Sequence, residues 1–199
     1  RKGAQRGHLG FGSLRERARM SQTNKYLSVV VPVFQSEVGL YELIKRLKAV
    51  LFSISPDVEL ILVDDGSTDG SWELIAKAAL EESFIKGIRF SRNFGQHHAI
   101  FAGLDMAQGE WVVVMDADLQ DLPEEIPMML TKVRYGYEAV LARRTGRKDS
   151  WASKILSTLY YRVFYLMSGI KQDPSIGNFG VYNRKIIDSI LKMRENNWY

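Results

Sequence analysis

Two pairs of carboxylates in the sequence have the residue types and the spacing to bind a cation. Asp116 and Asp118 follow one apolar run, and Asp64 and Asp65 directly follow another. Carboxylate oxygens are preferred ligands of Mg²⁺ and Mn²⁺, and such a cation can bridge the phosphates of a nucleotide. A carboxylate also accepts hydrogen bonds from a nucleobase N–H or a ribose hydroxyl. These residues are therefore candidates to bind Mg²⁺ or Mn²⁺ together with the phosphates of a nucleotide. The alternative is that both are solvated acidic turns that only cap the helices after them.

Hydrophobic periodicity predicts the strands and helices around these carboxylates. Apolar runs alternate with segments of helical period, which predicts an α/β fold with helices on both faces of a mostly parallel, twisted sheet. We expect strands at Leu27–Val33, Val58–Val63, Gly87–Phe90, Trp111–Met115, Ala139–Ala142 and Phe179–Tyr182. We expect helices at Val38–Phe52, Asp69–Ser83, Gln96–Ala107, Pro123–Tyr135, Ser150–Met167 and Arg184–Met193, with Ser67 and Asp69 capping the second. Because ligands bind beyond the carboxyl ends of parallel strands, both acidic turns should face one crevice.

Amino-acid composition indicates a globular protein and excludes several other classes. With 46% hydrophobic and 25% charged residues among 199, the sequence is typical of one globular domain. The absence of cysteine excludes a disulfide framework and a thiolate metal site, and it fits a reducing compartment such as the cytoplasm. No run reaches the roughly 18 apolar residues of a transmembrane helix, so we expect no membrane span.

Positive charge is concentrated at the start of the chain. The first 25 residues carry a net charge of +6, whereas the whole chain carries +4. The rest is slightly acidic, which argues against a nucleic-acid partner. We expect residues 1–25 to be a disordered basic tail that could touch anionic lipid, or a segment ahead of a native start at Met20. Residues 26–199 are expected to form the catalytic domain.

Four motifs in a fixed order carry a family resemblance. They are Val31–Phe34, Val63–Asp69, Ser91–Gly95 and Met115–Asp121. Together they resemble the inverting glycosyltransferases of the GT-A fold, a Rossmann-like nucleotide-sugar-binding fold. The similarity is greatest to the family 2 branches that contain dolichyl-phosphate mannose synthase and the bacterial undecaprenyl-phosphate glycosyltransferases. The resemblance covers about Tyr26–Met193, and it implies a nucleotide-sugar donor, Mg²⁺ or Mn²⁺, and a polyprenyl phosphate acceptor at the cytoplasmic face of a membrane.

The resemblance also implies roles for individual residues on the donor side. The nucleobase and ribose would lie near Pro32, Phe34, Asp64 and Asp65. Asp116 would contact the nucleotide or the metal, and Asp118, with Gln120, would hold the cation on the diphosphate. A cation there would neutralise the charge that grows on the leaving group.

On the acceptor side, Arg143, Arg144 and Arg147 are candidates to bind the acceptor phosphate or the donor diphosphate, unless they form only a solvated basic loop. The helix at Trp151–Met167 has aromatic edges, so it could lie on a bilayer or cover the sheet as part of the core. By resemblance, Asp173 would be the acceptor-side carboxylate, as a general base or an orienting group; alternatively it only caps a turn.

Two departures from the family pattern concern the acceptor. Gly180 and Val181 stand where many relatives have arginine and leucine, and the sequence ends at Tyr199 where many relatives continue into membrane-associated elements. We therefore keep two alternatives to a lipid acceptor: a glycosyltransferase with a saccharide acceptor in polysaccharide synthesis, and a non-catalytic nucleotide-sugar-binding or membrane-docking module. The oligomeric state is not predicted.

Overall fold

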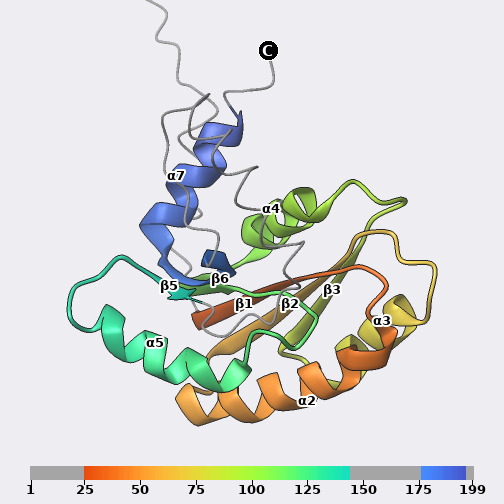
Figure 1. The fold of residues 1–199 in the computed structure, drawn as a ribbon, viewed down its shortest axis with the longest axis horizontal. Helices are drawn as coiled ribbons and strands as arrows, with labels where there is room; N and C mark the ends of the chain where they lie inside the picture. The colour runs from red at the N-terminus through yellow and green to blue at the C-terminus, as the bar shows by residue number, and fades with distance from the viewer. Residues whose placement is uncertain (1–24, 144–175, 196–199) are drawn as a thin grey trace, which may run out of the picture.

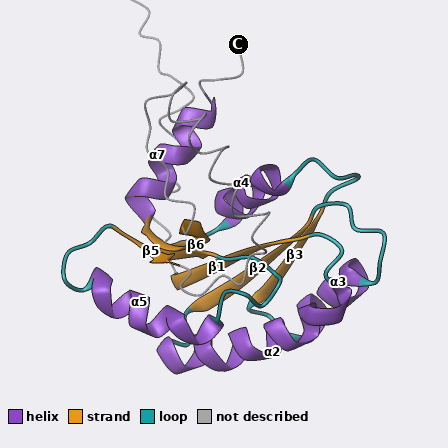
Figure 2. Cartoon of the chain, in the orientation of Figure 1, coloured by secondary structure: helices purple, strands orange, loops and turns teal. Residues whose placement is uncertain are grey.

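The computed structural model describes residues 25–143 and 176–195 (Figure 1). These residues form a six-stranded sheet with helices on both of its faces, which confirms the predicted α/β architecture (Figure 2). The predicted basic tail, except for Lys25 at the start of the first strand, and the predicted helix at Ser150–Met167 lie outside the described residues. Within the described residues, no helix combines the length and the apolar character that a membrane span requires.

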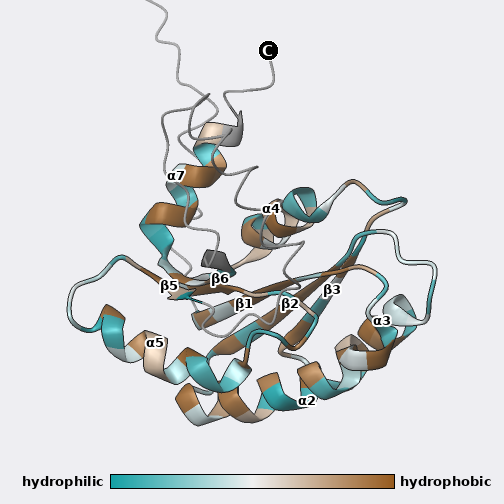
Figure 3. Cartoon of the chain, viewed as in Figure 1, coloured by the Kyte–Doolittle hydropathy of each residue, from teal (hydrophilic) through white to brown (hydrophobic). Residues whose placement is uncertain are grey.

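The sheet is mostly parallel. Its strands are β1 (Lys25–Val33), β2 (Val58–Asp64), β3 (Ile85–Arg89), β4 (Gly109–Val114), β5 (Ala139–Arg143) and β6 (Ile176–Asn183). The strand order is β3-β2-β1-β4-β6-β5, and β6 is antiparallel to both of its neighbours. Every residue of β2 is buried, as expected of an apolar strand that helices cover on both faces (Figure 3).

The helices form two layers. They are α2 (Glu37–Ile54), α3 (Ser71–Glu81), α4 (Gln96–Met106), α5 (Ile126–Val133), which follows the 3₁₀ turn η1 (Pro123–Glu125), and α7 (Arg184–Glu195). Helices α2, α3 and α5 cover one face of the sheet, and α4 and α7 cover the other (Figure 1). The alternation of strand side chains between the faces produces two separate apolar cores. Leu60 and Leu62 belong to one core, and Ile61 and Val63 to the other.

Several boundaries differ from the prediction, and two of the differences have a clear physical reason. The second helix begins at Ser71 rather than at Asp69, because Asp69 binds the first helical N–H with its side chain. The predicted helix at Pro123–Tyr135 divides into η1 and α5, and α5 ends at Val133, ahead of Gly136 with a φ of +92°. A helix commonly ends before a glycine in this left-handed conformation.

The chain changes direction across the sheet between β1 and β4. β2 and β3 lie on one side of β1, whereas β4, β6 and β5 lie on the other. Pairing of β1 with β4 ends at Val30 and Val114, and the N–H of Met115 makes a last bond to the Val30 carbonyl. The next ladder bond would need an N–H at Pro32, which has none. The two strands therefore part here, at the switch point where open α/β sheets bind their ligands.

Candidate functional site

The carboxyl ends of the parallel strands meet at one edge of the sheet. Val33 of β1 pairs with Asp64 of β2, which in turn pairs with Arg89 of β3. Asp116 follows β4 by two residues on the other side of β1. The structure thus brings the two acidic turns to the same edge, as the sequence predicted.

Asp64 is fully buried and paired. Its Oδ1 accepts a hydrogen bond of 3.2 Å from the backbone N–H of Ser67, and its Oδ2 lies 3.5 Å from Nε of Arg89. The Arg89 guanidinium also lies over the Trp72 ring, 5.4 Å from its centroid. A buried carboxylate needs such an opposite charge, because desolvation without a partner is costly. Asp64 therefore holds together the turn after β2 and the end of β3.

Asp65 is also buried, and it faces different partners. Its two carboxylate oxygens accept hydrogen bonds from the backbone N–H groups of Phe94 at 2.7 Å and of Gly95 at 2.9 Å. Gly66 has a φ of +71°, and a Cβ at this position would lie 2.4 Å from the backbone carbon of Arg92. The turn after β2 is therefore packed directly on the loop that precedes α4. Direct contact of Asp64 or Asp65 with a nucleotide stays a prediction.

The residues after β1 present an aromatic side chain at the same edge. Phe34 is 44% exposed, and Gln35 adopts a φ of +48°. The backbone N–H of Gln35 donates a 3.0 Å hydrogen bond to Oγ of Ser67. Ser67 was expected to cap α3, and this was wrong: its hydroxyl holds the loop after β1 instead. Pro32 is buried within β1, and its expected place near the nucleobase stays a prediction.

Asp69 and Glu37 join the starts of two helices. Asp69 accepts hydrogen bonds of 3.1 Å from the backbone N–H groups of Ser71 in α3 and Glu37 in α2. Glu37 in return accepts a 3.0 Å bond from the N–H of Gly70. Burial opposes ionisation of Asp69, but the hydrogen bonds from Ser71 and Glu37 outweigh it and lower the pKa of this carboxyl. The expected capping role of Asp69 is confirmed, and it extends to a second helix.

The second acidic turn presents two carboxylates of different character. Asp116 is half-buried, and its Oδ1 accepts hydrogen bonds from Nε2 of Gln96 at 2.7 Å and from Nδ2 of Asn178 at 3.2 Å. Asp118 is exposed, and its Oδ1 accepts a 3.0 Å bond from the backbone N–H of Gln120. Gln120 is exposed as well. The turn thus combines one oriented carboxylate with one accessible carboxylate.

This donor set fits a divalent cation that is shared with a nucleotide. The described residues contain no group of three or more His, Cys, Asp or Glu side chains arranged around a common metal position. Mg²⁺ commonly takes one or two protein carboxylates and completes its coordination with substrate phosphates and water. Asp116 and Asp118 would supply such a partial set. The cation would then depend on the nucleotide for the rest of its ligands.

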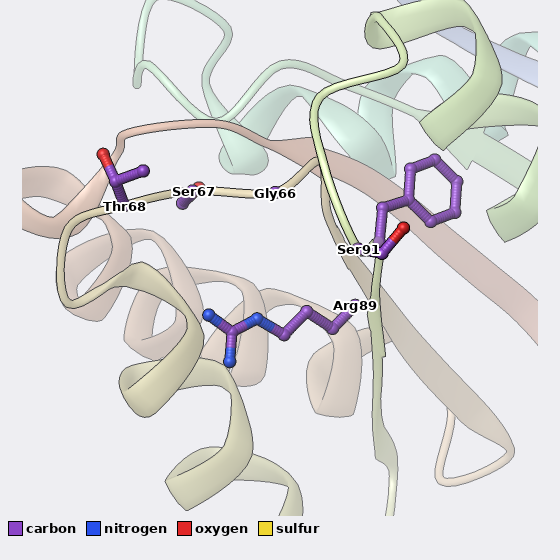
Figure 4. A pocket seen from close by; sticks show the side chains of 6 residues that line it. Gly66, Ser67, Thr68, Arg89 and Ser91 are labelled. Carbon is purple, nitrogen blue, oxygen red and sulfur yellow. The ribbon is translucent and has the colours of Figure 1, made fainter.

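A pocket of about 460 Å³ lies beside the first acidic turn. It is lined by Gly66, Ser67 and Thr68 on the loop after β2, and by Arg89, Phe90 and Ser91 at the end of β3. Figure 4 shows the Arg89 side chain reaching from β3 into the space below the loop that carries Ser67 and Thr68. The lining therefore offers a guanidinium and hydroxyl groups that can recognise a polar ligand.

The predicted acceptor residues are only partly described. Arg143 is exposed at the end of β5 and pairs with Ile176 of β6. Because β6 lies between β4 and β5, Arg143 and Asp116 flank the first residues of β6 at the same edge. Arg144, Arg147 and Asp173 lie outside the described residues.

Two site residues, Gln96 and Asn178, were missed by the sequence analysis. Gln96 begins α4 directly after the motif that ends at Gly95, so its position was visible but its partner was not. Asn178 reaches Asp116 because β6 lies beside β4 in the antiparallel direction. The apolar pattern of a strand carries no information on its direction, so this contact had no sequence signal.

Comparison with known proteins gives relatives over most of the chain. The undecaprenyl-phosphate 4-deoxy-4-formamido-L-arabinose transferase of Aeromonas hydrophila is 40% identical over 176 residues, which are 88% of this chain and 54% of that protein. The uncharacterized glycosyltransferase YkcC of Bacillus subtilis is 41% identical over 179 residues, 89% of this chain and 55% of that protein. The chain spans about half the length of the curated relatives it matches.

Solved structures agree with the fold. One is glucosyl-3-phosphoglycerate synthase of Mycobacterium tuberculosis in complex with Mn²⁺, uridine diphosphate and phosphoglyceric acid; it has a TM-score of 0.58 and 19% identity, over 92% of this chain and 62% of that chain. Residues 1–349 of TarS of S. aureus in complex with uridine diphosphate give a TM-score of 0.55 and 19% identity, over 83% of this chain and 48% of that chain. These likenesses confirm the predicted GT-A fold.

The family is given by a match along most of the chain. The family model described as Glycosyl transferase family 2 matches residues 28–191, which include both acidic turns and the strands that present them. The chain therefore belongs to glycosyl transferase family 2.

Proposed function

We propose that this chain binds a nucleotide diphosphate sugar and transfers the sugar, with inversion, to a polyprenyl phosphate at a membrane surface. One observation carries the proposal: the acidic turn with Asp116 and Asp118 and the acidic turn after β2 lie at the same edge of the sheet, on either side of the β1–β4 switch point. The lipid acceptor is supported by the name of the relative from A. hydrophila, an undecaprenyl-phosphate 4-deoxy-4-formamido-L-arabinose transferase.

The donor would lie across the carboxyl ends of β1, β2 and β4. Its nucleoside would lie near exposed Phe34 and the pocket at Arg89 and Ser91, where an aromatic face and polar groups are available. Its diphosphate would lie at Asp116 and Asp118 with Mg²⁺ or Mn²⁺, with Gln120 beside them. Asp64 and Asp65 would lie beneath the donor and hold the loops around it, because both carboxylates are buried.

The reaction would be a direct displacement. An oxygen of the acceptor phosphate attacks the anomeric carbon while the bond from that carbon to the diphosphate oxygen breaks, so the new bond forms on the opposite face. A divalent cation, when bound, would stabilise the negative charge on the departing diphosphate. A phosphate is already ionised at pH 7, so no proton has to be removed. Asp173 would then orient the acceptor rather than act as a base.

The acceptor would approach from the side of β5. Arg143 is at this side of the described site, and Arg144 and Arg147 follow it in the sequence. Arginine forks suit phosphate oxygens, and a membrane surface would keep the polyprenyl chain in lipid while its headgroup reaches the donor. This placement extends the proposal to a domain that works at the cytoplasmic face of a membrane.

Calorimetry with UDP and GDP, each with and without MnCl₂, tests the donor half of the proposal. We expect tight binding of one nucleotide only with the metal. Asp118→Asn should weaken that metal-dependent binding by about tenfold or more, which corresponds to roughly 1.4 kcal/mol, because the amide keeps the shape but loses the anionic ligand. Equal affinities of wild type and variant would contradict the assignment of Asp118.

Transfer assays test the acceptor half. Radiolabelled nucleotide sugar should label undecaprenyl phosphate in vesicles, and Arg144→Ala with Arg147→Ala should reduce this labelling far more than it reduces binding of UDP or GDP. Labelling of a soluble saccharide in place of the lipid would support the alternative acceptor.

A further inference from the structure

We infer that Gln96 and Asn178 are positioning residues that set the orientation of Asp116 for the cation-bound diphosphate. This inference rests on the proposed function. The two side-chain amides donate to the same oxygen, Oδ1 of Asp116, at 2.7 Å and 3.2 Å. A carboxylate rotates freely about its last torsion unless something holds it. Two donors on one oxygen define that torsion and direct the carboxylate plane.

Each donor comes from a separately anchored part of the fold. Gln96 is the first residue of α4, directly after Gly95, and the N–H groups of Phe94 and Gly95 are both bonded to Asp65. Asn178 is followed in β6 by Phe179, which is 1% exposed, and by Gly180, which pairs with Val114 of β4. Asp116 is therefore held between two elements whose backbones are fixed elsewhere.

The same contacts join the two ends of the proposed donor site. Asp65, on the nucleoside side, holds the loop from which Gln96 reaches Asp116, on the diphosphate side. A shift of this loop would move the Gln96 amide and rotate the carboxylate. The loop before α4 thus couples the position of the nucleoside to the geometry of the diphosphate.

Because Gln96 is exposed, its role in positioning Asp116 can be distinguished from a role in stabilising the fold. Gln96 is exposed, so its amide would find water as an alternative partner, and the net stability from its hydrogen bond is small. Removing the amide should therefore leave folding almost unchanged. Orientation of Asp116 should suffer instead, because partners of ligating carboxylates typically affect metal affinity by 10–100-fold.

The test uses Gln96→Met, which keeps the length of the side chain but removes the donor, and Asn178→Ala. His97→Ala is the matched control, because His97 is also exposed in the first turn of α4, directly beside Gln96. Affinity for UDP and GDP is measured by calorimetry with and without MnCl₂, and stability is measured by urea unfolding. Asp116→Asn is measured in parallel.

We expect Gln96→Met and Asn178→Ala each to weaken Mn²⁺-dependent binding by about tenfold, while metal-free binding changes less than about twofold. The double variant should cost less than the product of the two single effects, because both residues act through one carboxylate. In ¹⁵N spectra of the wild type, the side-chain amide signals of Gln96 and Asn178 should shift when Mg²⁺ and the nucleotide are added together.

The outcomes separate this inference from the proposed function. If Asp116→Asn weakens Mn²⁺-dependent binding but Gln96→Met and Asn178→Ala do not, the inference is wrong and the proposed function stands. Equal losses with and without metal would show a structural role and would also overturn the inference. Absence of metal-dependent binding in the wild type would overturn the proposed function and the inference with it.

Discussion

Asp64 and Asp65 are neighbours in the sequence, yet they hold different parts of the site. Successive side chains at a strand end point to opposite faces of the sheet. Asp64 accordingly meets Arg89 on the side of α3, and Asp65 meets the loop that leads into α4. One acidic pair thus fixes the loops on both sides of the sheet edge.

The Asp69 carboxylate should make the free energy of unfolding decrease as the solution becomes acidic. Its pKa is lowered in the folded state, so its contribution is fully present above the ordinary carboxyl pKa of about 3.9 and is lost as the pH falls through the lowered value. Asp69→Ala should cost about 1 kcal/mol at pH 7, as loss of a helix cap does. Urea unfolding of both proteins between pH 7 and pH 2.5 would check this. A difference that persists undiminished at the lowest pH would contradict the role of the ionised carboxylate.

Among the secondary-structure elements, the site depends on the contact between two loops. The turn after β2 and the loop before α4 touch at Gly66, where a Cβ would lie within 3 Å of the backbone of Arg92 and Asn93. Asp65 adds two hydrogen bonds across the same contact. Backbone packed on backbone leaves little room for adjustment.

Gly66→Ala should therefore be more damaging than conformational strain alone explains. Gly136 is the matched control, because it also has a positive φ, of +92°, but nothing lies within 4 Å of a Cβ there. We expect Gly136→Ala to cost about 1 kcal/mol, and Gly66→Ala to cost roughly 2–3 kcal/mol. Thermal unfolding measures both. Equal losses would mean that the loop contact yields to a methyl group.

The elements were predictable from the sequence to a greater extent than the contacts between them. The apolar run at Val58–Val63 predicted a strand, and the acidic residues after it predicted a ligand-binding site at the strand end. Both predictions were possible because hydrophobic periodicity and burial are local properties. The antiparallel direction of β6, the Asn178 contact and the partner of Ser67 depend on which segments lie side by side. Such contacts join residues that are distant in the sequence, and no local pattern records them.

Across the fold as a whole, the amino-end and carboxyl-end edges of the sheet differ in character. At the amino ends of the strands, Glu59 is 1% exposed and accepts hydrogen bonds from Oγ of Ser28 at 2.6 Å, Nζ of Lys86 at 2.7 Å and the N–H of Gln108 at 2.6 Å. This network is far from the proposed donor site along the strands, and it fixes the loop between α4 and β4. Its role is structural.

Glu59→Gln should destabilise the fold by about 2 kcal/mol, because the amide cannot pair with Lys86 while the lysine remains. Affinity for the nucleotide should not change. Glu81→Gln is the control: its pair with Lys77 is exposed and 3.9 Å long, so its loss should cost less than about 0.5 kcal/mol. Urea unfolding and calorimetry test the two statements independently. A loss of nucleotide affinity in the folded Glu59→Gln variant would show that the two edges are coupled.

Pro32 removes one hydrogen bond from the end of the β1–β4 pairing. Since its ring nitrogen carries no hydrogen, the ladder bond that would follow the one between Met115 and Val30 cannot form. A covalent feature therefore helps to open the crevice, and a donor bound as proposed would not have to break that hydrogen bond. Binding would be relieved of this reorganisation cost, so more of its free energy would appear as affinity.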